Sequence, residues 1–116
     1  MEKTITIGTK EVKMRATAAT PLHYRNTFKG YDLFKDLQKN EGKDIQDMDL
    51  SVFERLAFIM SGEFRNMSLE DWLDQFDGLT DVVEACAEIL TAWNDSAEPQ
   101  SIPRKNEETA ENSIQV

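Results

Sequence analysis

The residues best suited to chemistry are few and lie far apart. The chain has one histidine, His23, and one cysteine, Cys86. Catalysis by either would need a partner group within hydrogen-bond reach, and nothing in the sequence places one there. His23 falls in the first turn of an expected helix, and Cys86 falls in the middle of an apolar helix face. We therefore expect a surface histidine and a packed, unreactive thiol.

The only other candidate for chemistry is a cluster of acidic residues. Asp71, Asp74 and Asp77 are spaced by three, and Glu70 precedes them. Carboxylates can bind a hard cation, but a calcium-binding EF-hand loop needs alternating ligands, a central glycine and a terminal glutamate. That pattern is missing, as are a GxGxxG loop, a phosphate loop and a nucleophile elbow. We therefore predict a non-enzyme with no catalytic residues, no metal and no cofactor.

Composition narrows the class of protein further. The chain has 116 residues, of which 40% are hydrophobic, enough for one domain with one core. A net charge of -9 argues against nucleic acid and anionic membranes as partners. No apolar run is long enough to span a membrane, and the N-terminus does not read as a secretory signal. With one cysteine no internal disulfide can form, which fits a reducing cytoplasm.

The charge is distributed unevenly along the chain. Residues 1–40 carry eight Lys/Arg against four Asp/Glu, giving +4, whereas residues 41–95 carry three against fourteen, giving -11. The simpler interpretation is a hydrated acidic face. The other is that the asymmetry orients subunits head to tail or steers a basic partner.

The stretch from Asp49 to Gly62 is expected to organise the fold. At about 100° per residue its apolar side chains fall on one helix face, with Val52 and Ile59 nearly opposite. A helix that is apolar on two sides is usually enclosed, so we place it at the centre. Asp49 is the expected N-cap, and Gly62 is the expected C-terminal stop. The main face consists of Leu50, Phe53, Leu56, Ala57, Met60 and Phe64.

The N-terminal residues predict a β-hairpin. Residues 4–7 and 11–15 alternate polar and apolar side chains, and Gly8-Thr9-Lys10 lies between them. An isolated hairpin is marginal in water, so it must lie against the helices. Its outer edge could pair with a second copy, and a homo-oligomer is a hypothesis. The expected buried face is Ile5, Ile7, Val12 and Met14.

Capping and stop signals predict four further helices. One runs over about 21–29 and stops at Gly30, and the next is capped by Asp32 and reaches about Lys39. Ser68 opens a helix over 69–76, and Thr80 caps one over about 81–94. The predicted fold is therefore mainly α: a small bundle of about five helices with an N-terminal hairpin over about 3–16. We expect residues 1–95 to form one domain and residues 96–116 to form a disordered polar tail.

Several segments together carry a family resemblance. The hairpin ends in Ala16-Thr17-Ala18-Ala19-Thr20-Pro21, and residues 24–37 then read YRNTFKGYDLFKDL. Residues 53–60 (FERLAFIM) and 68–76 (SLEDWLDQF) follow. This order resembles the tail assembly chaperones of long-tailed phages and prophages of Gram-positive bacteria, over roughly residues 3–94.

The resemblance implies a function in phage assembly. Such proteins bind the tape-measure protein while the tail is built, keep it soluble and help load tail-tube subunits around it. The implied partners are the tape-measure protein and, in second place, the major tail-tube protein. The implied location is the host bacterial cytoplasm, with the protein absent from the mature virion.

Aromatic and methionine side chains near the central helix are the expected partner contacts. Phe58 falls among Ser51, Glu54 and Arg55, so it either meets a second layer such as the hairpin or is an exposed anchor. The core interpretation is favoured for it. A different functional class remains open: a small acidic regulatory adaptor or DNA mimic that binds a basic surface. The candidate partner-binding residues are Phe28, Tyr31, Phe34, Phe58, Met60 and Trp72.

Overall fold

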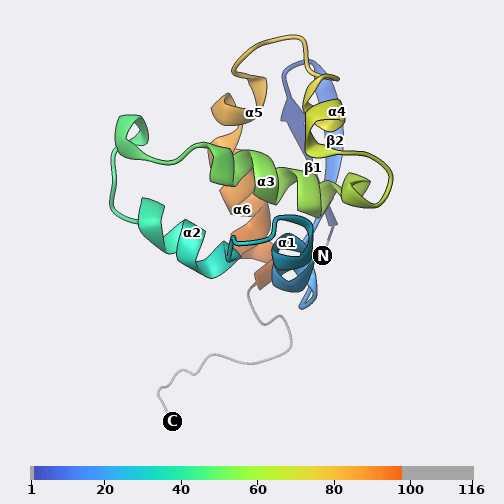
Figure 1. Ribbon diagram of the computed structural model, residues 1–116. Helices are drawn as coiled ribbons and strands as arrows, with labels where there is room; N and C mark the ends of the chain where they lie inside the picture. Colours follow the sequence, from blue (N-terminus) through green and yellow to red (C-terminus); the bar gives the residue numbers. More distant parts are fainter. Residues whose placement is uncertain (1, 98–116) are drawn as a thin grey trace.

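The helix α3 (Ser51–Ser61) lies at the centre of the molecule (Figure 1). The structure is a computed structural model that describes residues 2–97. Every side chain from Val52 to Met60 is buried except that of Glu54, which confirms the enclosed position expected from two apolar faces. The helix ends at Gly62, whose φ of +80° is the left-handed conformation that glycine adopts at little cost.

The hairpin packs one face against the helices. Strands β1 (Glu2–Ile7) and β2 (Lys10–Arg15) pair antiparallel, with Ile5 opposite Val12 and Ile7 opposite Lys10. The turn is therefore the two residues Gly8-Thr9, one shorter than expected. Gly8 has a φ of +63°, and a Cβ there would collide with the Asp81 carboxylate. On the expected buried face, Ile5, Ile7 and Met14 are buried and Val12 is half-buried.

Two helices follow the hairpin and lie beside α3 (Figure 1). Helix α1 (Thr20–Thr27) begins with Pro21 in its first turn, and α2 (Leu33–Asn40) begins where Asp32 accepts a hydrogen bond from the Lys35 N–H at 3.0 Å. Both helices lie within about two residues of their predicted positions. The 3-10 helix η1 (Ile45–Asp47) lies in the polar connection to α3.

The C-terminal half differs from the prediction in two places. Helix α4 (Leu69–Leu73), which follows the 3-10 helix η2 (Glu63–Arg65), is shorter than expected, because Gln75 and Phe76 bond three residues back in turns. The helix expected over 81–94 is two helices, α5 (Asp81–Glu84) and α6 (Cys86–Ala97). The N–H of Ala85 bonds to the Val82 carbonyl in a three-residue turn that separates them.

The described residues thus contain six α-helices and the hairpin around one core. Helix α6 extends through Ser96 to Ala97, two residues beyond the expected end of the domain. The predicted disordered tail otherwise lies outside the described residues. Helix α3 contacts β2 and each of the other five α-helices, so it is the element against which the surrounding helices pack.

Candidate partner-binding face

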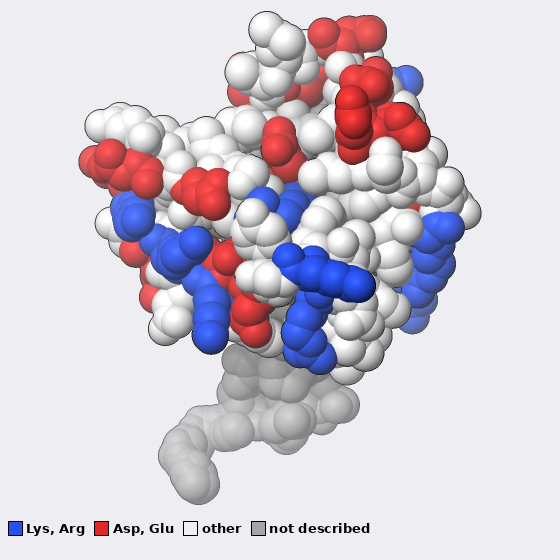
Figure 2. Space-filling model, viewed as in Figure 1, with Lys and Arg blue, Asp and Glu red and all other residues white. Residues whose placement is uncertain are grey.

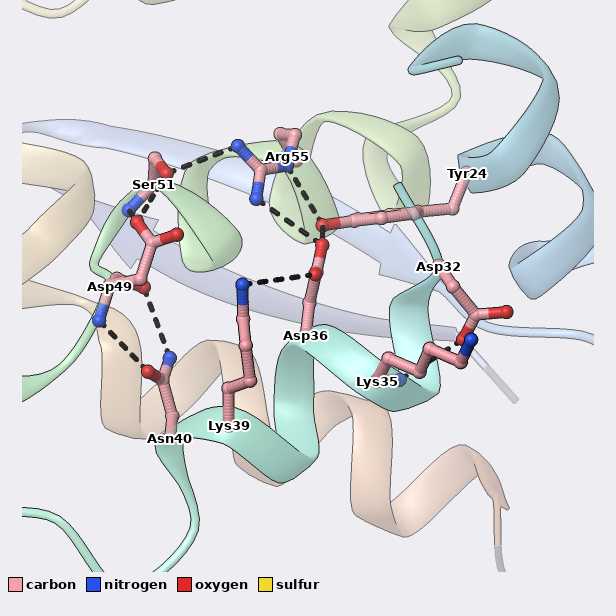
Figure 3. A network of polar contacts seen from close by, with 9 residues as sticks. All are labelled: Tyr24, Asp32, Lys35, Asp36, Lys39, Asn40, Asp49, Ser51 and Arg55. Carbon is pink, nitrogen blue, oxygen red and sulfur yellow. Dashed lines mark hydrogen bonds and ion pairs between the residues drawn. The ribbon is translucent and has the colours of Figure 1, made fainter. Parts of the chain in front are cut away.

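A buried polar network joins the first three helices (Figure 3). The Tyr24 hydroxyl of α1 donates to Asp36 Oδ2 of α2 at 2.7 Å. Arg55 of α3 donates from Nε to the Tyr24 oxygen at 2.8 Å and from Nη2 to Asp36 Oδ2 at 3.3 Å. One side chain from each helix thus meets at a single point, which fixes α1 and α2 against α3.

The network determines the protonation states of Tyr24 and Arg55. Burial raises the pKa of Tyr24, and its hydrogen bond to Asp36 raises it further, so the phenol remains a donor. Burial alone would lower the pKa of Arg55, but its hydrogen bond to Tyr24 and the nearby charges outweigh this effect and raise it. The result is a buried cation paired with a buried carboxylate. Such a pair tolerates few substitutions, since either partner alone would be an uncompensated charge.

A second link holds the C-terminal end of α2. The buried Asn40 side chain donates to the Asp49 carbonyl at 3.0 Å and accepts from the Asp49 N–H at 2.8 Å. The Asp49 carboxylate accepts from both the N–H and the hydroxyl of Ser51 at the start of α3. The Ser51 hydroxyl is the main cause that lowers the pKa of Asp49. Asp49 therefore bonds the first residue of α3 and also receives the end of α2, but the N-cap residue is Leu50 rather than the predicted Asp49.

This scaffold places aromatic rings on the surface of α2 and the residues before it. The Tyr31 ring lies under the Arg55 guanidinium, 4.2 Å from its centroid, and 46% of Tyr31 remains exposed. Phe34 is 60% exposed and meets Trp93 of α6 edge to face, with centroids 6.1 Å apart. Two predicted contact residues, Tyr31 and Phe34, are therefore accessible.

Phe34 lines an apolar groove of about 570 Å³, the α1–α2–α6 groove. Leu22, 43% exposed, lies in the same groove, and Arg25 is the one charged residue among its lining side chains. Few large apolar side chains are this exposed in the described region, so two in one groove mark a candidate contact surface. The lining residues are Ala16, Thr17, Ala18, Pro21, Leu22, Arg25, Phe34, Trp93 and Ser96.

Three of the six predicted contact residues lie instead in the core. Phe58, Met60 and Trp72 are each at most 2% exposed, so they present no surface to a partner in this structure. Phe58 meets Trp72 at 5.6 Å and Phe28 at 6.2 Å, which confirms the core interpretation favoured for it. Phe28 is half-buried between them and Tyr24. The physical reason is that α4 and the hairpin cover the side of α3 that α1 and α2 leave free.

The face formed by α1 and α2 is rich in basic residues, whereas the end of the molecule at α4 is rich in acidic residues. Figure 2 shows blue side chains gathered over α1 and α2, whereas red side chains gather over α4 and the turn that follows it. Helices α1 and α2 and the turn between them carry Arg25, Lys29, Lys35 and Lys39. The acidic end carries Glu70, Asp71, Asp74 and Asp77. The separation is confined to these elements, because the basic hairpin lies beside the C-terminal helices, where Lys3 pairs with Asp95.

Sequence reasoning missed part of this face. The predicted contact residues include neither Leu22 nor Trp93, and Arg55 has no predicted role. A signal existed for Arg55, because an arginine inside a helix apolar on two sides must find a buried partner. No signal identified Asp36 as that partner, since the two residues are 19 positions apart. Trp93 lines the groove because the C-terminal half of α6 comes close to α2, where the Trp93 ring meets that of Phe34.

The single histidine and the single cysteine pack within the fold. His23 stacks on Phe64 at 4.8 Å and lies 3.4 Å from Arg65 Nη2, and Cys86 is half-buried at the start of α6. Within residues 2–97 no three histidine, cysteine or carboxylate side chains gather as metal ligands would. Over the same residues no helix has the length and apolar character needed to cross a membrane.

Comparisons of the chain with known protein families, curated proteins and solved structures found no significant match. The resemblance to tail assembly chaperones therefore stays a prediction from sequence.

Proposed function

We propose that this protein is a tail assembly chaperone that holds a segment of the tape-measure protein in the α1–α2–α6 groove. In this proposal it acts in the host cytoplasm, keeps its partner soluble while tail-tube subunits are added, and leaves before the virion is complete. The observation that carries the proposal is the presence of Phe34 and Leu22, both largely exposed, in one apolar groove. No bond is made or broken, so the protein is a binding protein rather than an enzyme.

The groove has the chemistry of a helix-binding surface. Apolar grooves hold amphipathic helices through a few apolar anchors, and aromatic side chains supply much of the binding energy at such contacts. Phe34 is held from behind by Trp93, and α2 is fixed by the Arg55 network and by Asn40. Because these elements are ordered before binding, little conformational entropy is lost when a partner arrives.

The charge distribution supports the same function. A bound apolar segment would be covered on one side only, and the acidic end would keep the complex in solution by mutual repulsion between complexes. The basic side chains of α1 and α2 favour a partner segment with acidic residues beside its apolar stripe.

Co-expression with the tape-measure protein tests the proposal. The native chain is expected to raise the soluble yield of the tape-measure protein and to co-purify with it. The double variant Leu22→Asp/Phe34→Asp should lose both effects, because two carboxylates would enter an apolar contact. Leu79→Asp is the matched control, since Leu79 is fully exposed and lies outside the groove. An unchanged yield with the native chain would refute the chaperone function.

The same experiment separates the acidic adaptor, which would bind a basic surface through the α4–α5 end. Such binding would survive the double groove variant and would fall steeply as salt is raised. Binding at the groove should depend on salt only weakly, because apolar contact dominates it.

A further inference from the structure

Strand β2 has an open edge. Within the described residues the sheet has two strands, so β2 pairs with β1 on one side only. The two-residue turn makes Ile7–Lys10 a hydrogen-bonded pair, and every second pair after it is bonded as well. The backbone groups of Glu11, Lys13 and Arg15 therefore point away from β1. No described residue forms a hydrogen bond with them.

Space for another strand lies along this edge. A groove of about 680 Å³ runs between β2 and a wall formed by α1, the end of α3, η2, α4 and the turn after α4. Val12 is half-buried on the side of β2 that faces the core, whereas Glu11 and Lys13 project to the other side and are exposed. An added strand would therefore meet an apolar residue on one face and charges of both signs on the other.

We propose that β2 pairs antiparallel with β2 of a second copy of this chain, in the register centred on Val12. The two hairpins then form one four-stranded sheet with the two β2 strands at its middle. In this register Glu11 lies opposite the partner's Lys13, and Lys13 lies opposite the partner's Glu11. Both backbone groups of each of these residues gain partners, and the two Val12 side chains meet at the symmetry axis.

The charges select both the occupant and the register. Lysines on an edge strand normally oppose pairing with an unrelated strand. The alternation of Glu11 and Lys13 removes this obstacle for a second copy, because opposite charges face each other twice across the axis. A register centred on Lys13 would place two lysines opposite each other, although Glu11 would face the partner's Arg15 on either side of them. The register centred on Val12 is therefore the one that pairs opposite charges without setting like charges opposite each other.

This surface is separate from the proposed chaperone groove. None of the residues from Lys10 to Arg15 lines the α1–α2–α6 groove, so self-association and partner binding can be measured independently. A dimer of this kind would carry two grooves for two segments of one long partner, which raises the effective affinity for it.

Sedimentation equilibrium over a concentration series tests the proposal. The native chain is expected to show a monomer–dimer equilibrium. Glu11→Lys or Lys13→Glu alone places like charges opposite each other twice and should raise the dissociation constant by roughly tenfold. Glu88→Lys and Lys29→Glu make the same charge changes at exposed positions that do not line the groove along β2, and they should leave the dissociation constant unchanged.

Mixing the two single variants gives the decisive measurement. In the mixed dimer each lysine of the Glu11→Lys chain faces a glutamate of the Lys13→Glu chain, so the mixture should associate as tightly as the native chain. A native chain that stays monomeric over the whole series would overturn the proposal. Single variants that associate like the native chain, or a mixture that associates no better than either variant alone, would overturn it as well.

Discussion

At the scale of single residues, Arg55 fixes α1 and α2, which carry the candidate partner-binding face, against α3. It is the only buried cation among the described residues, and its partners come from two other helices. Removing water from a guanidinium and a carboxylate is costly, and the Tyr24 hydroxyl shared between them offsets part of that cost. The network thus contributes less to net stability than to the fixed position of α1 and α2.

Replacing Arg55 by an uncharged residue should lower the free energy of unfolding. Arg55→Met keeps most of the side-chain volume but leaves Asp36 buried without its closest positive charge. We expect the free energy of unfolding to fall by about 3 kcal/mol. Lys39→Met is the matched control, because Lys39 is exposed and lies 3.9 Å from Asp36 Oδ1, and it should cost less than about 1 kcal/mol. Urea denaturation measures both, and equal losses for the two variants would contradict this role of Arg55.

Tyr24 gives the network a dependence on alkaline pH. Its pKa is raised above the ordinary value of 10.0, so its contribution to stability is complete below pH 10. Above pH 10 the unfolded chain releases this proton and the folded chain retains it, so stability falls. Tyr24→Phe should remove part of the fall in urea midpoint between about pH 9 and pH 11. An identical slope for the native chain and the Tyr24→Phe variant would rule out this assignment.

At the scale of elements, local signals identified most of the fold. Asp32 and Ser68 cap their helices, Gly62 stops α3, and alternation located both strands, because each of these features depends on a few neighbouring residues. The break at Ala85 and the early end of α4 depend on more than periodicity, so the prediction made α4 too long and joined α5 and α6 into one helix. The site was only partly predictable: Tyr31 and Phe34 are among the predicted contact residues and are exposed, whereas Trp72 is buried against Phe58.

The attachment of α2 to α3 can be tested at Asn40. Its side chain makes two hydrogen bonds to the Asp49 backbone, so Asn40→Ala leaves the Asp49 N–H without a protein partner and leaves the Asp49 carbonyl with only the Val52 N–H, at 3.3 Å. We expect a loss of about 2 kcal/mol in the free energy of unfolding. Gln38→Ala, at an exposed position on the same helix, should change it by less than about 0.5 kcal/mol. Faster amide hydrogen exchange in α2 of the Asn40→Ala variant would show that this helix detaches first, and unchanged exchange there would show that the link is dispensable.

At the scale of the whole molecule, the features separate into two surfaces and one acidic end. The α1–α2–α6 groove offers apolar anchors beside basic residues, and the β2 edge offers backbone groups beside alternating charges. The acidic end over α4 and α5 presents few apolar side chains other than Leu79. This division suits a protein that holds an apolar partner on one side and keeps the complex dispersed with another.

The most direct test of the groove is a map of backbone amide shifts by NMR while a helical tape-measure fragment is added. The account predicts that the largest shifts fall on residues 16–25, on Phe34 and on Trp93, and that Leu22→Asp/Phe34→Asp abolishes them. Shifts confined to the acidic residues 70–84, still present in that double variant, would contradict it.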